Sequence, residues 1–215
     1  MSLAEDLEKL MLEITATVPR ETLAVMGRAM GRLKGAGVID NCLRVGDRAP
    51  EFSLPNVQAE MVSSGDILAR GAMVLSFYRG VWCPFCNLEL QALQLRQTDM
   101  EMRGAKLVAV SPQLPDNSLA TAEILSLTFE VVSDVGNNVA RQFGIVFTLP
   151  EEMRQIYSGF GIDLPAANGD ETFELPVPAT YVINREGIIA HAYVDIDHTK
   201  RLEPETIIGV LNELR

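Results

Sequence analysis

Two cysteines, Cys83 and Cys86, are separated by two residues in a chain of 215 residues that has only three cysteines. So few cysteines do not make a disulfide scaffold, and a close pair of this spacing is typical of redox or metal chemistry. A continuous apolar run, Met73–Tyr78, ends shortly before the pair, and helix signals extend from Pro84 to about Met102. The pair is therefore predicted to lie where a buried strand passes into a helix.

A position at the start of a helix favours ionisation of the first thiol. Pro84 suits the first helical turn, which places Cys83 beside unpaired backbone N–H groups and the positive end of the helix dipole. The thiolate, which is the nucleophilic form of cysteine, is favoured there. Cys86 lies one turn deeper on the same side, shielded but near enough to attack a sulfur adduct on Cys83. Arg79, four residues before Cys83, could add positive charge to the site.

Two other chemistries are open to such a pair. A structural zinc site needs four ligands, and besides the pair the chain offers only Cys42, His191 and His198, with no second close pair. A Cys–His hydrolase dyad has weak support because neither histidine is near the cysteines in sequence. His191 is expected within a strand, and His198 in a solvated loop. Cys42 is predicted to be a small buried hydrophobe, with an inter-subunit partner for Cys83 as the alternative.

The elements that must position the pair follow from the hydrophobic pattern. Strands are expected at five apolar segments: Met73–Tyr78, Lys106–Ser111, Phe129–Ser133, Ala179–Ile183 and Ile188–Val194. Helices are expected over 84–102 and 117–127, and from Pro204 towards the C-terminus. The segment 145–176 is irregular in pattern and contains one candidate helix, Glu151 to Tyr157. This order predicts an α/β fold with a central mixed sheet and helices on both faces.

Residues 1–44 are predicted to be a helical extension preceding a main domain of residues 45–215. Ser2 and Glu5 form a capping-box pattern, and Pro19 could begin a second helix. Each helix has an apolar face, made by Leu3, Leu7, Leu10 and Ile14 in the first and by Leu23, Met26, Met30 and Leu33 in the second. These faces must be buried against the body or a second subunit, so a homo-oligomer, and a dimer in particular, is expected.

Charge and hydropathy exclude several classes of partner. The 18 basic and 29 acidic residues give a net charge of −11, whereas nucleic acids and anionic membranes attract clustered positive charge. No apolar run approaches the ~20 residues of a membrane-spanning helix. The N-terminus lacks a basic start followed by an apolar stretch, so no secretory signal is expected and a cytoplasmic location is predicted.

The chain resembles the thioredoxin-like superfamily at Trp82-Cys83-Pro84-Phe85-Cys86, which follows a hydrophobic strand as in the thioredoxin active site. Its body resembles the peroxiredoxin branch, the alkyl hydroperoxide reductase / thiol-specific antioxidant family. The resembling segments, spread over residues 45–215, are Val45–Phe52, Leu75–Gly80, Val108–Pro112 and Val177–Asn184. The resemblance implies a thioredoxin-like fold for the body and leaves residues 1–44 outside.

The peroxiredoxin resemblance implies that Cys83 is the peroxidatic cysteine and that Cys86 resolves it as a disulfide. The chain departs from the family pattern at three places. Gly80 replaces a threonine or serine three residues before the cysteine, and Ser76 replaces a proline seven residues before it. Pro178 occupies the place of the arginine that precedes the late strand. Arg79 and Arg141 are the candidates to replace that arginine.

The thioredoxin resemblance covers other features. Pro178 matches the proline that thioredoxins hold cis beside their disulfide, and Trp82 is expected to offer a flat surface to a partner. The buried acid that thioredoxins place six residues before the first cysteine is replaced here by Phe77. The chain therefore combines features of both branches, and neither set of catalytic residues is complete.

Together these features predict a thiol-dependent oxidoreductase with antioxidant activity, which reduces peroxides and is recycled by a thiol of the thioredoxin or glutathione system. Cys83 and Cys86 are the expected catalytic residues, and Arg79, Gly80, Trp82, Pro84 and Pro178 are expected to support them. No metal or other cofactor is expected. One alternative is a reductase of protein or small-molecule disulfides. Another is a non-catalytic redox-sensing module.

Overall fold

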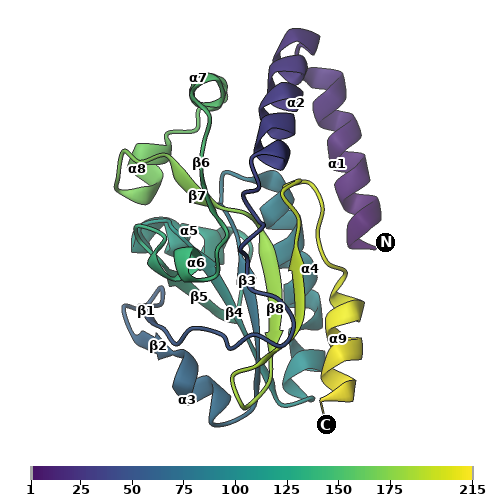
Figure 1. Cartoon of the computed structure of the whole chain (residues 1–215), viewed down its shortest axis with the longest axis vertical. Helices are drawn as coiled ribbons and strands as arrows, with labels where there is room; N and C mark the ends of the chain where they lie inside the picture. The colour runs from purple at the N-terminus through teal and green to yellow at the C-terminus, as the bar shows by residue number, and fades with distance from the viewer. Residues whose placement is uncertain (1, 215) are drawn as a thin grey trace.

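A computed structural model describes residues 2–214, in which a central sheet is covered by helices on both faces (Figure 1). Within these residues five strands form the sheet in the order β5-β4-β3-β8-β9. Their bounds are β3 (Ala72–Phe77), β4 (Ala105–Ser111), β5 (Glu130–Ser133), β8 (Ala179–Ile183) and β9 (Ile189–Val194). Strands β3, β4 and β5 are parallel, whereas β8 is antiparallel to both β3 and β9. The predicted mixed sheet is confirmed.

Strand β3 lies at the centre of the sheet and leads to the cysteine pair. All six of its residues are buried, because neighbouring strands pair with both edges and helices cover both faces. At its end, Phe77 lies opposite Val110 of β4 and Ala179 of β8. The chain therefore leaves β3 at a point fixed by hydrogen bonds on both sides.

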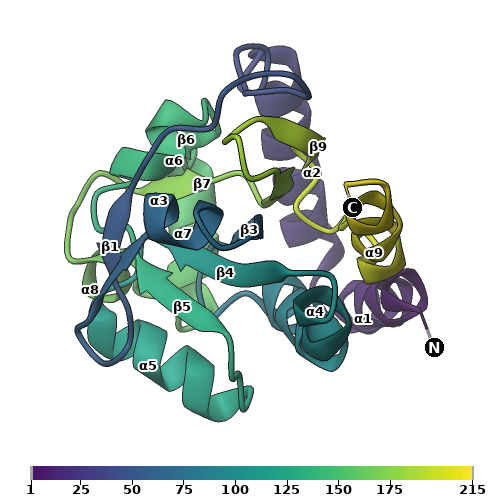
Figure 2. The same cartoon turned by 90° about the horizontal axis from the view of Figure 1, so that it is seen from below.

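Three helices, α4, α5 and α9, cover one face of the sheet, and α1 packs against α4 on the same side (Figure 2). The bounds of these helices are α1 (Leu3–Thr17), α4 (Pro84–Glu101), α5 (Pro115–Ile124) and α9 (Pro204–Glu213). Val74 and Leu107 of the sheet pack with Leu90 of α4 and Ile207 of α9 in this layer. Both cysteines of the pair belong to the same cluster, so the site is built into the main core.

The opposite face is covered by two short helices, α3 (Ser64–Leu68) and α6 (Asn138–Gln142). Three aromatic rings fill this layer: Phe77 lies 5.0 Å from Phe143, and Phe143 lies 4.9 Å from Tyr181 between ring centroids. Short elements that the sequence pattern did not predict border the sheet. They are β1 (Ser53–Pro55), β2 (Met61–Ser63), β6 (Val146–Thr148), β7 (Glu174–Pro176) and α8 (Leu164–Asn168). Three-residue strands are too short to show a period, which is why they were missed.

Helices α1 and α2 (Arg20–Gly35) form a hairpin along one side of the body (Figure 1). The predicted capping box is present, with reciprocal hydrogen bonds between Ser2 and Glu5. Leu3 and Leu7 are buried in the core, and Ala29 of α2 is buried against α7 (Glu151–Gly159). The apolar faces of the hairpin thus pack on the body, although only Leu3, Leu7 and Ala29 are buried and the other apolar side chains stay partly exposed. None of the helices described is both long and apolar enough to cross a lipid bilayer.

We expect Leu7→Ala to weaken docking of α1 on the body by about 2–5 kcal/mol, because it removes a buried side chain and leaves a cavity. Amide hydrogen exchange within α1 measures this as a lower free energy of opening. Leu12→Ala is the matched control, since Leu12 is on the same helix but 66% exposed. Equal exchange rates in the two variants would contradict the packing described.

Candidate active site

The cysteine pair lies at the first turn of α4. Cys83 is the N-cap residue with extended backbone angles (φ −96°, ψ 103°), and Pro84 occupies the first turn. Pro84 is favourable there because the first N–H groups of a helix have no partner inside it. Cys86 donates a hydrogen bond to Cys83 with 2.8 Å between the sulfur atoms. Both side chains are fully buried, so a reactant must reach them through the protein.

The loop between β3 and α4 is shaped by a close contact at Gly80. Its φ of 148° disfavours other residues, and a Cβ atom there would overlap the indole of Trp82 and the side-chain oxygen of Gln113. Gln113 also accepts a hydrogen bond from the Val81 N–H (2.9 Å), and Asn87 donates to the Val81 carbonyl (2.8 Å). Glycine at this position therefore lets Trp82 fold over the loop that carries Cys83.

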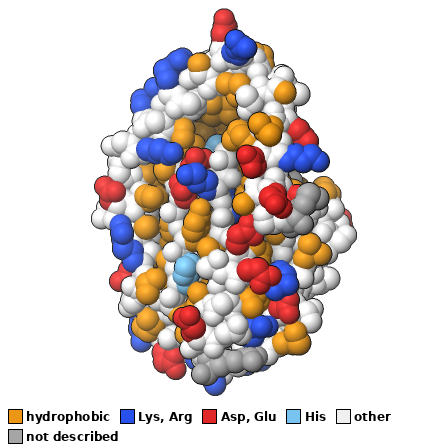
Figure 3. Space-filling view, turned by 90° about the vertical axis from the view of Figure 1, so that its right-hand side faces the viewer, with side chains coloured by type: hydrophobic (Ala, Val, Ile, Leu, Met, Phe, Trp, Pro, Cys, Tyr) orange, Lys and Arg blue, Asp and Glu red, His pale blue; other side chains and the backbone are white. Residues whose placement is uncertain are grey.

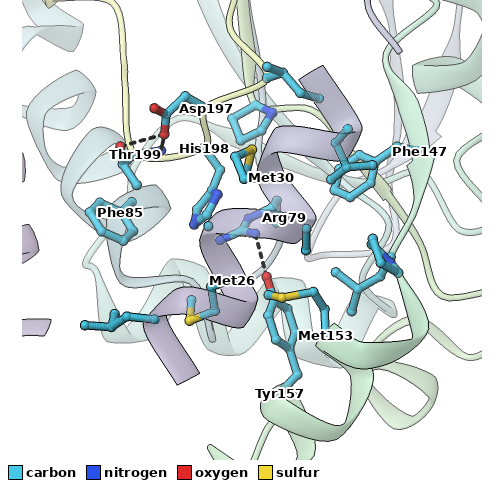
Figure 4. Close-up of a pocket in the computed structure, with 18 of the residues that line it drawn as sticks. Met26, Met30, Arg79, Phe85, Phe147, Met153, Tyr157, Asp197, His198 and Thr199 are labelled. Atoms are coloured by element: carbon cyan, nitrogen blue, oxygen red, sulfur yellow. Dashed lines mark hydrogen bonds between the residues drawn. The ribbon is translucent and has the colours of Figure 1, made fainter. Parts of the chain in front are cut away.

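Arg79 contacts the first cysteine directly. Its Nη2 donates to Cys83 Sγ at 3.0 Å. Its Nη1 donates to the Tyr157 hydroxyl of α7 at 2.8 Å, as Figure 4 shows. The guanidinium lies 5.1 Å from the centre of the Trp82 ring, which in turn packs against Tyr157 at 5.6 Å. Arg79 is only 4% exposed, so its charge is poorly screened by water. The aromatic pair holds it against the sulfur.

A second arginine contacts the second cysteine. Arg201, from the loop before α9, donates to Cys86 Sγ at 3.3 Å and to Glu89 at 2.5 Å. Glu89 also accepts a hydrogen bond from Thr180 of β8 at 3.2 Å. Both partners of the Arg201–Glu89 ion pair are buried. Each sulfur atom thus has its own arginine, and a buried carboxylate orients the second one.

These contacts give the two thiols different pKa values. Burial alone would raise the pKa of Cys83, but the hydrogen bond from Cys86 and the charges of Arg79 and Arg201 outweigh it and hold that pKa well below its ordinary value. The pKa of Cys86 is raised well above its ordinary value by burial, by its hydrogen bond to Cys83 and by the charge of that thiolate. Of the two thiols, Cys83 is therefore the one that favours the thiolate form, and Cys86 is the one that keeps its proton.

Two further titratable groups lie beside the pair. Burial raises the pKa of Glu89 to about 7, although Arg201 opposes the shift. Burial and the charges of Arg79 and Arg201 hold the pKa of His198 well below its ordinary value, so its imidazole is neutral. His198 packs its ring edge-on against Phe85 at 5.7 Å. The expectation that His198 lies in a solvated loop is wrong, because its loop folds back over the start of α4.

Several other sequence predictions are corrected by the structure. The peptide bond before Pro178 is trans, because the chain continues extended from β7 into β8 and Val177 donates to the Ile145 carbonyl at 2.7 Å. Arg141 is not near the cysteines, since it forms an exposed ion pair with Glu174 (2.6 Å). Cys42 is half-buried in the cluster on the opposite face of the sheet. This packing agrees with the expectation of a small hydrophobe.

The zinc alternative has no ligand set around the pair. Within residues 2–214, no three His, Cys, Asp or Glu side chains are grouped as metal ligands. The cysteine sulfurs contact arginines instead, and a cationic guanidinium is a poor neighbour for a second cation.

Glu89, Tyr157, His198 and Arg201 were missed as site residues. One of them carried a readable signal, because the spacing of Cys86, Glu89 and Leu93 places a carboxylate on the buried face of an amphipathic helix. The others come from segments far along the chain and have no local pattern. They reach the site only because α7 packs on the loop that carries Arg79 and Trp82, and because the 196–201 loop packs on α4.

Comparison with known proteins agrees with this geometry. The family model "AhpC/TSA family" matches residues 45–192, about two-thirds of the chain. The chain belongs to the AhpC/TSA family. It is 30% identical to peroxiredoxin Bcp of Escherichia coli over 105 residues, 49% of this chain and 67% of that protein. It is 23% identical to chloroplastic peroxiredoxin Q of Triticum aestivum over 191 residues, 89% of this chain and 75% of that protein.

Solved structures show the same fold. The crystal structure of peroxidoxin BcpB from Mycobacterium tuberculosis has a TM-score of 0.63 at 19% identity, covering 80% of this chain and 99% of that chain. A peroxiredoxin-like protein from Aquifex aeolicus has a TM-score of 0.62, also at 19% identity, covering 80% and 88%. The chain is thus a peroxiredoxin-like protein with a thioredoxin-type fold. Helices α1, α2 and α9 all lie outside the family match.

We expect Arg79→Gln to raise the pKa of Cys83, because it removes an opposite charge in contact with the thiolate. Thiolate absorbance in the ultraviolet, measured against pH in a Cys86→Ser background, reports this. With Arg79 present, thiolate should be lost only as the pH falls well below ~8.5, the value for a free thiol. Arg141→Gln is the control and should leave the titration unchanged; an equal shift in both variants would refute a specific role for Arg79.

Proposed function

We propose that this chain is a thiol peroxidase in which Cys83 reduces a peroxide and Cys86 resolves the product. The observation that carries the proposal is the joint contact of Cys83 Sγ with Arg79 Nη2 at 3.0 Å and with Cys86 Sγ at 2.8 Å. The first contact favours a nucleophilic thiolate, and the second allows a disulfide to close with little backbone movement. Membership of the AhpC/TSA family supports thiol-dependent peroxide reduction.

The reaction has three balanced steps. The Cys83 thiolate attacks the terminal peroxide oxygen, the O–O bond breaks, and the leaving oxyanion takes up a proton to give an alcohol or water. Cys83 becomes a sulfenic acid, which is a two-electron oxidation of sulfur. Cys86 then attacks this sulfur, and a disulfide and a second water form. Two external thiols return both cysteines to the reduced state and leave as their own disulfide.

Arg201 is proposed to assist the second step. Cys86 must lose its proton as it attacks, and a donor 3.3 Å from its sulfur stabilises the negative charge that develops. Glu89 acts as a positioning residue, because it binds Arg201 and is itself held by Thr180. The raised pKa of Cys86 is consistent with a thiol that waits for the sulfenic acid before it reacts.

Disulfide reduction is the second candidate, and Trp82 beside Cys83 is the feature that favours it. Burial of both sulfur atoms argues against it for protein disulfides, because a large partner cannot bring its sulfur to a side chain that is 0% exposed. A small peroxide needs a far smaller opening to reach Cys83 than a protein disulfide does. A redox-sensing module would show slow turnover with a change in partner affinity on oxidation.

The remaining assignments are part of the same proposal. A thiol of the thioredoxin or glutathione system is proposed as the reductant, and the cytoplasm as the location, where such thiols are maintained. A homodimer remains a prediction. Gly80 and Pro84 are proposed to shape the loop and helix start, while Pro178 and Trp82 border the path to Cys83.

Cys83→Ser should abolish steady-state peroxide consumption, because it removes the nucleophile. Cys86→Ser should still reduce one equivalent of peroxide and then stall as a sulfenic acid, which a dimedone adduct identified by mass spectrometry detects. Cys42→Ser is the control and should turn over normally. If Cys83→Ser retains peroxidase activity, or if insulin disulfides are reduced faster than peroxide, the proposal fails.

Arg201→Met should slow disulfide closure by about tenfold or more while the initial reaction with peroxide proceeds, since a charge-assisted bond of ~1.5–3 kcal/mol to the attacking sulfur is lost. Arg201→Lys keeps the charge and should be affected less. Rapid-mixing fluorescence of Trp82, the only tryptophan, separates the two phases.

Because removing one member of a buried ion pair can cost about 3–5 kcal/mol, Glu89→Gln combined with Arg201→Met tests closure without an orphaned charge. An unchanged rate of disulfide closure in Arg201→Met and in the double variant would exclude a role of Arg201 in this step.

A further inference from the structure

Gln113 is a fully buried amide that contacts the loop between β3 and α4 from inside the protein. It lies between β4 and α5, in a segment that supplies none of the reacting groups, and it is 0% exposed. Buried amides are retained where their hydrogen bonds are satisfied, because an unpaired polar group in the core is costly. The partners of Gln113 therefore show what this side chain does.

The hydrogen bonds of the Gln113 amide fix its orientation. Its Oε1 accepts from the Val81 N–H at 2.9 Å, and its Nε2 donates to the Thr121 hydroxyl of α5 at 3.0 Å. The Val81 N–H can only donate, and Thr121 gives its own proton to the Asn117 carbonyl at 2.9 Å. A flipped amide would place donor against donor at Val81. Helix α5 thus orients Gln113, and Gln113 in turn holds the backbone of Val81.

This bond connects the turn at residues 80–82 to a separate part of the chain. The Cys83 N–H donates to the Gly80 carbonyl at 3.0 Å, and the Asn87 side chain donates to the Val81 carbonyl at 2.8 Å. Both of those bonds stay within the turn and the first turns of α4, so they would move together with Cys83. The bond from Gln113 instead fixes the turn relative to β4 and α5.

Arg79 depends on such a connection because open space lies beside it. A cavity of about 300 Å³ between the helical hairpin and the body is lined by Arg79, and Figure 3 shows a hollow on this side of the molecule. The guanidinium points into this region near Tyr157 and His198 (Figure 4), and its buried Nε–H has no hydrogen-bond partner. Packing therefore does not confine Arg79 from this direction.

Glycine at position 80 adds to the need for an external restraint. Gly80 joins Arg79 to the turn that leads to Cys83, and a glycine has more backbone freedom than any other residue. Gln113 lies directly against Gly80, because a Cβ atom there would overlap its side-chain oxygen. The same amide thus contacts the flexible residue and bonds to the one that follows it.

We propose that Gln113 is a positioning residue, which holds the 80–82 turn so that the Arg79 guanidinium stays in contact with the Cys83 sulfur. The inference rests on the proposed function of Cys83 as the reacting thiolate. Among the contacts of the described residues, Gln113 bonds to neither Arg79 nor Cys83, so it acts through the turn between them. Without it the turn relaxes and the 3.0 Å contact between guanidinium and sulfur is lost.

Three substitutions separate this role from a general effect on the core. Gln113→Met keeps the length of the side chain and removes both hydrogen bonds. Thr121→Val keeps the shape of Thr121 and removes the acceptor that orients the amide, so it should act in the same direction but more weakly. Ser118→Ala is the matched control, because Ser118 is also buried on α5 but bonds to Ser133 of β5 at 2.7 Å instead of to Gln113.

The first measurement is the ultraviolet titration of the Cys83 thiolate in a Cys42→Ser, Cys86→Ser background, where Cys83 is the only thiol. Gln113→Met should lose the thiolate at a higher pH than the background protein, because the charge of Arg79 is less well placed. Ser118→Ala should titrate like the background. No shift in Gln113→Met, or an equal shift in Ser118→Ala, overturns the proposal. If Gln113→Met does not fold, an unshifted Thr121→Val overturns it.

A double-mutant cycle tests whether Gln113 acts through Arg79. In the Arg79→Gln protein the contact is already lost, so adding Gln113→Met should shift the titration no further. Additive shifts would show an effect that does not pass through Arg79 and would refute the proposal.

Peroxide kinetics distinguish failure of this proposal from failure of the proposed function. The rate constant for hydrogen peroxide should fall about tenfold or more in Gln113→Met, since small misplacements of reacting groups can cost up to about a hundredfold. Ser118→Ala should keep the wild-type rate. A shifted titration in a protein whose wild-type form reduces no peroxide would support the role of Gln113 and reject only the peroxidase. An unchanged rate in Gln113→Met of an active enzyme would reject the role of Gln113.

Discussion

The contact between the Arg79 guanidinium and the Cys83 sulfur is the interaction on which the site depends. A thiolate buried at 0% exposure is unstable without a compensating positive charge, because burial disfavours the charged form. Helix α4 contributes the partial charge of its N-terminus, and Arg79 contributes a full charge at 3.0 Å. Tyr157 and Trp82 restrict the guanidinium to this position, so structure distant from the loop maintains the reactivity of the cysteine.

The second sulfur has a parallel but distinct environment. Arg201 reaches Cys86 from the other end of the chain, and Glu89 neutralises and orients it within the core. A buried ion pair contributes little net stability, since desolvation offsets much of the attraction. Its place beside Cys86 fits the proposed need to stabilise charge when this thiol is deprotonated. In the proposed reaction the two arginines therefore serve successive steps.

The helical hairpin connects the family fold with the environment of the site. Its apolar faces pack partly against the body, and α2 borders a cavity that is also lined by Arg79. A segment outside the family match thus borders the surroundings of Arg79, while both cysteines belong to the loop and helix start that follow β3.

Local patterning was enough to predict the central strand, the helix start at Cys83 and Pro84, the mixed sheet and the helical character of residues 3–35. These features depend on hydrophobic period, capping and turn chemistry, and each of these is determined by a few neighbouring residues. Local patterning could not predict four other features: the choice of Arg79 over Arg141, the Arg201–Glu89 pair, the burial of His198 and the trans peptide at Pro178. Cys86 and Arg201 are 115 residues apart, and Arg79 and Tyr157 are 78 apart. Their contact depends on how whole elements pack, because side chains from distant segments meet only after the sheet and its covering helices have formed.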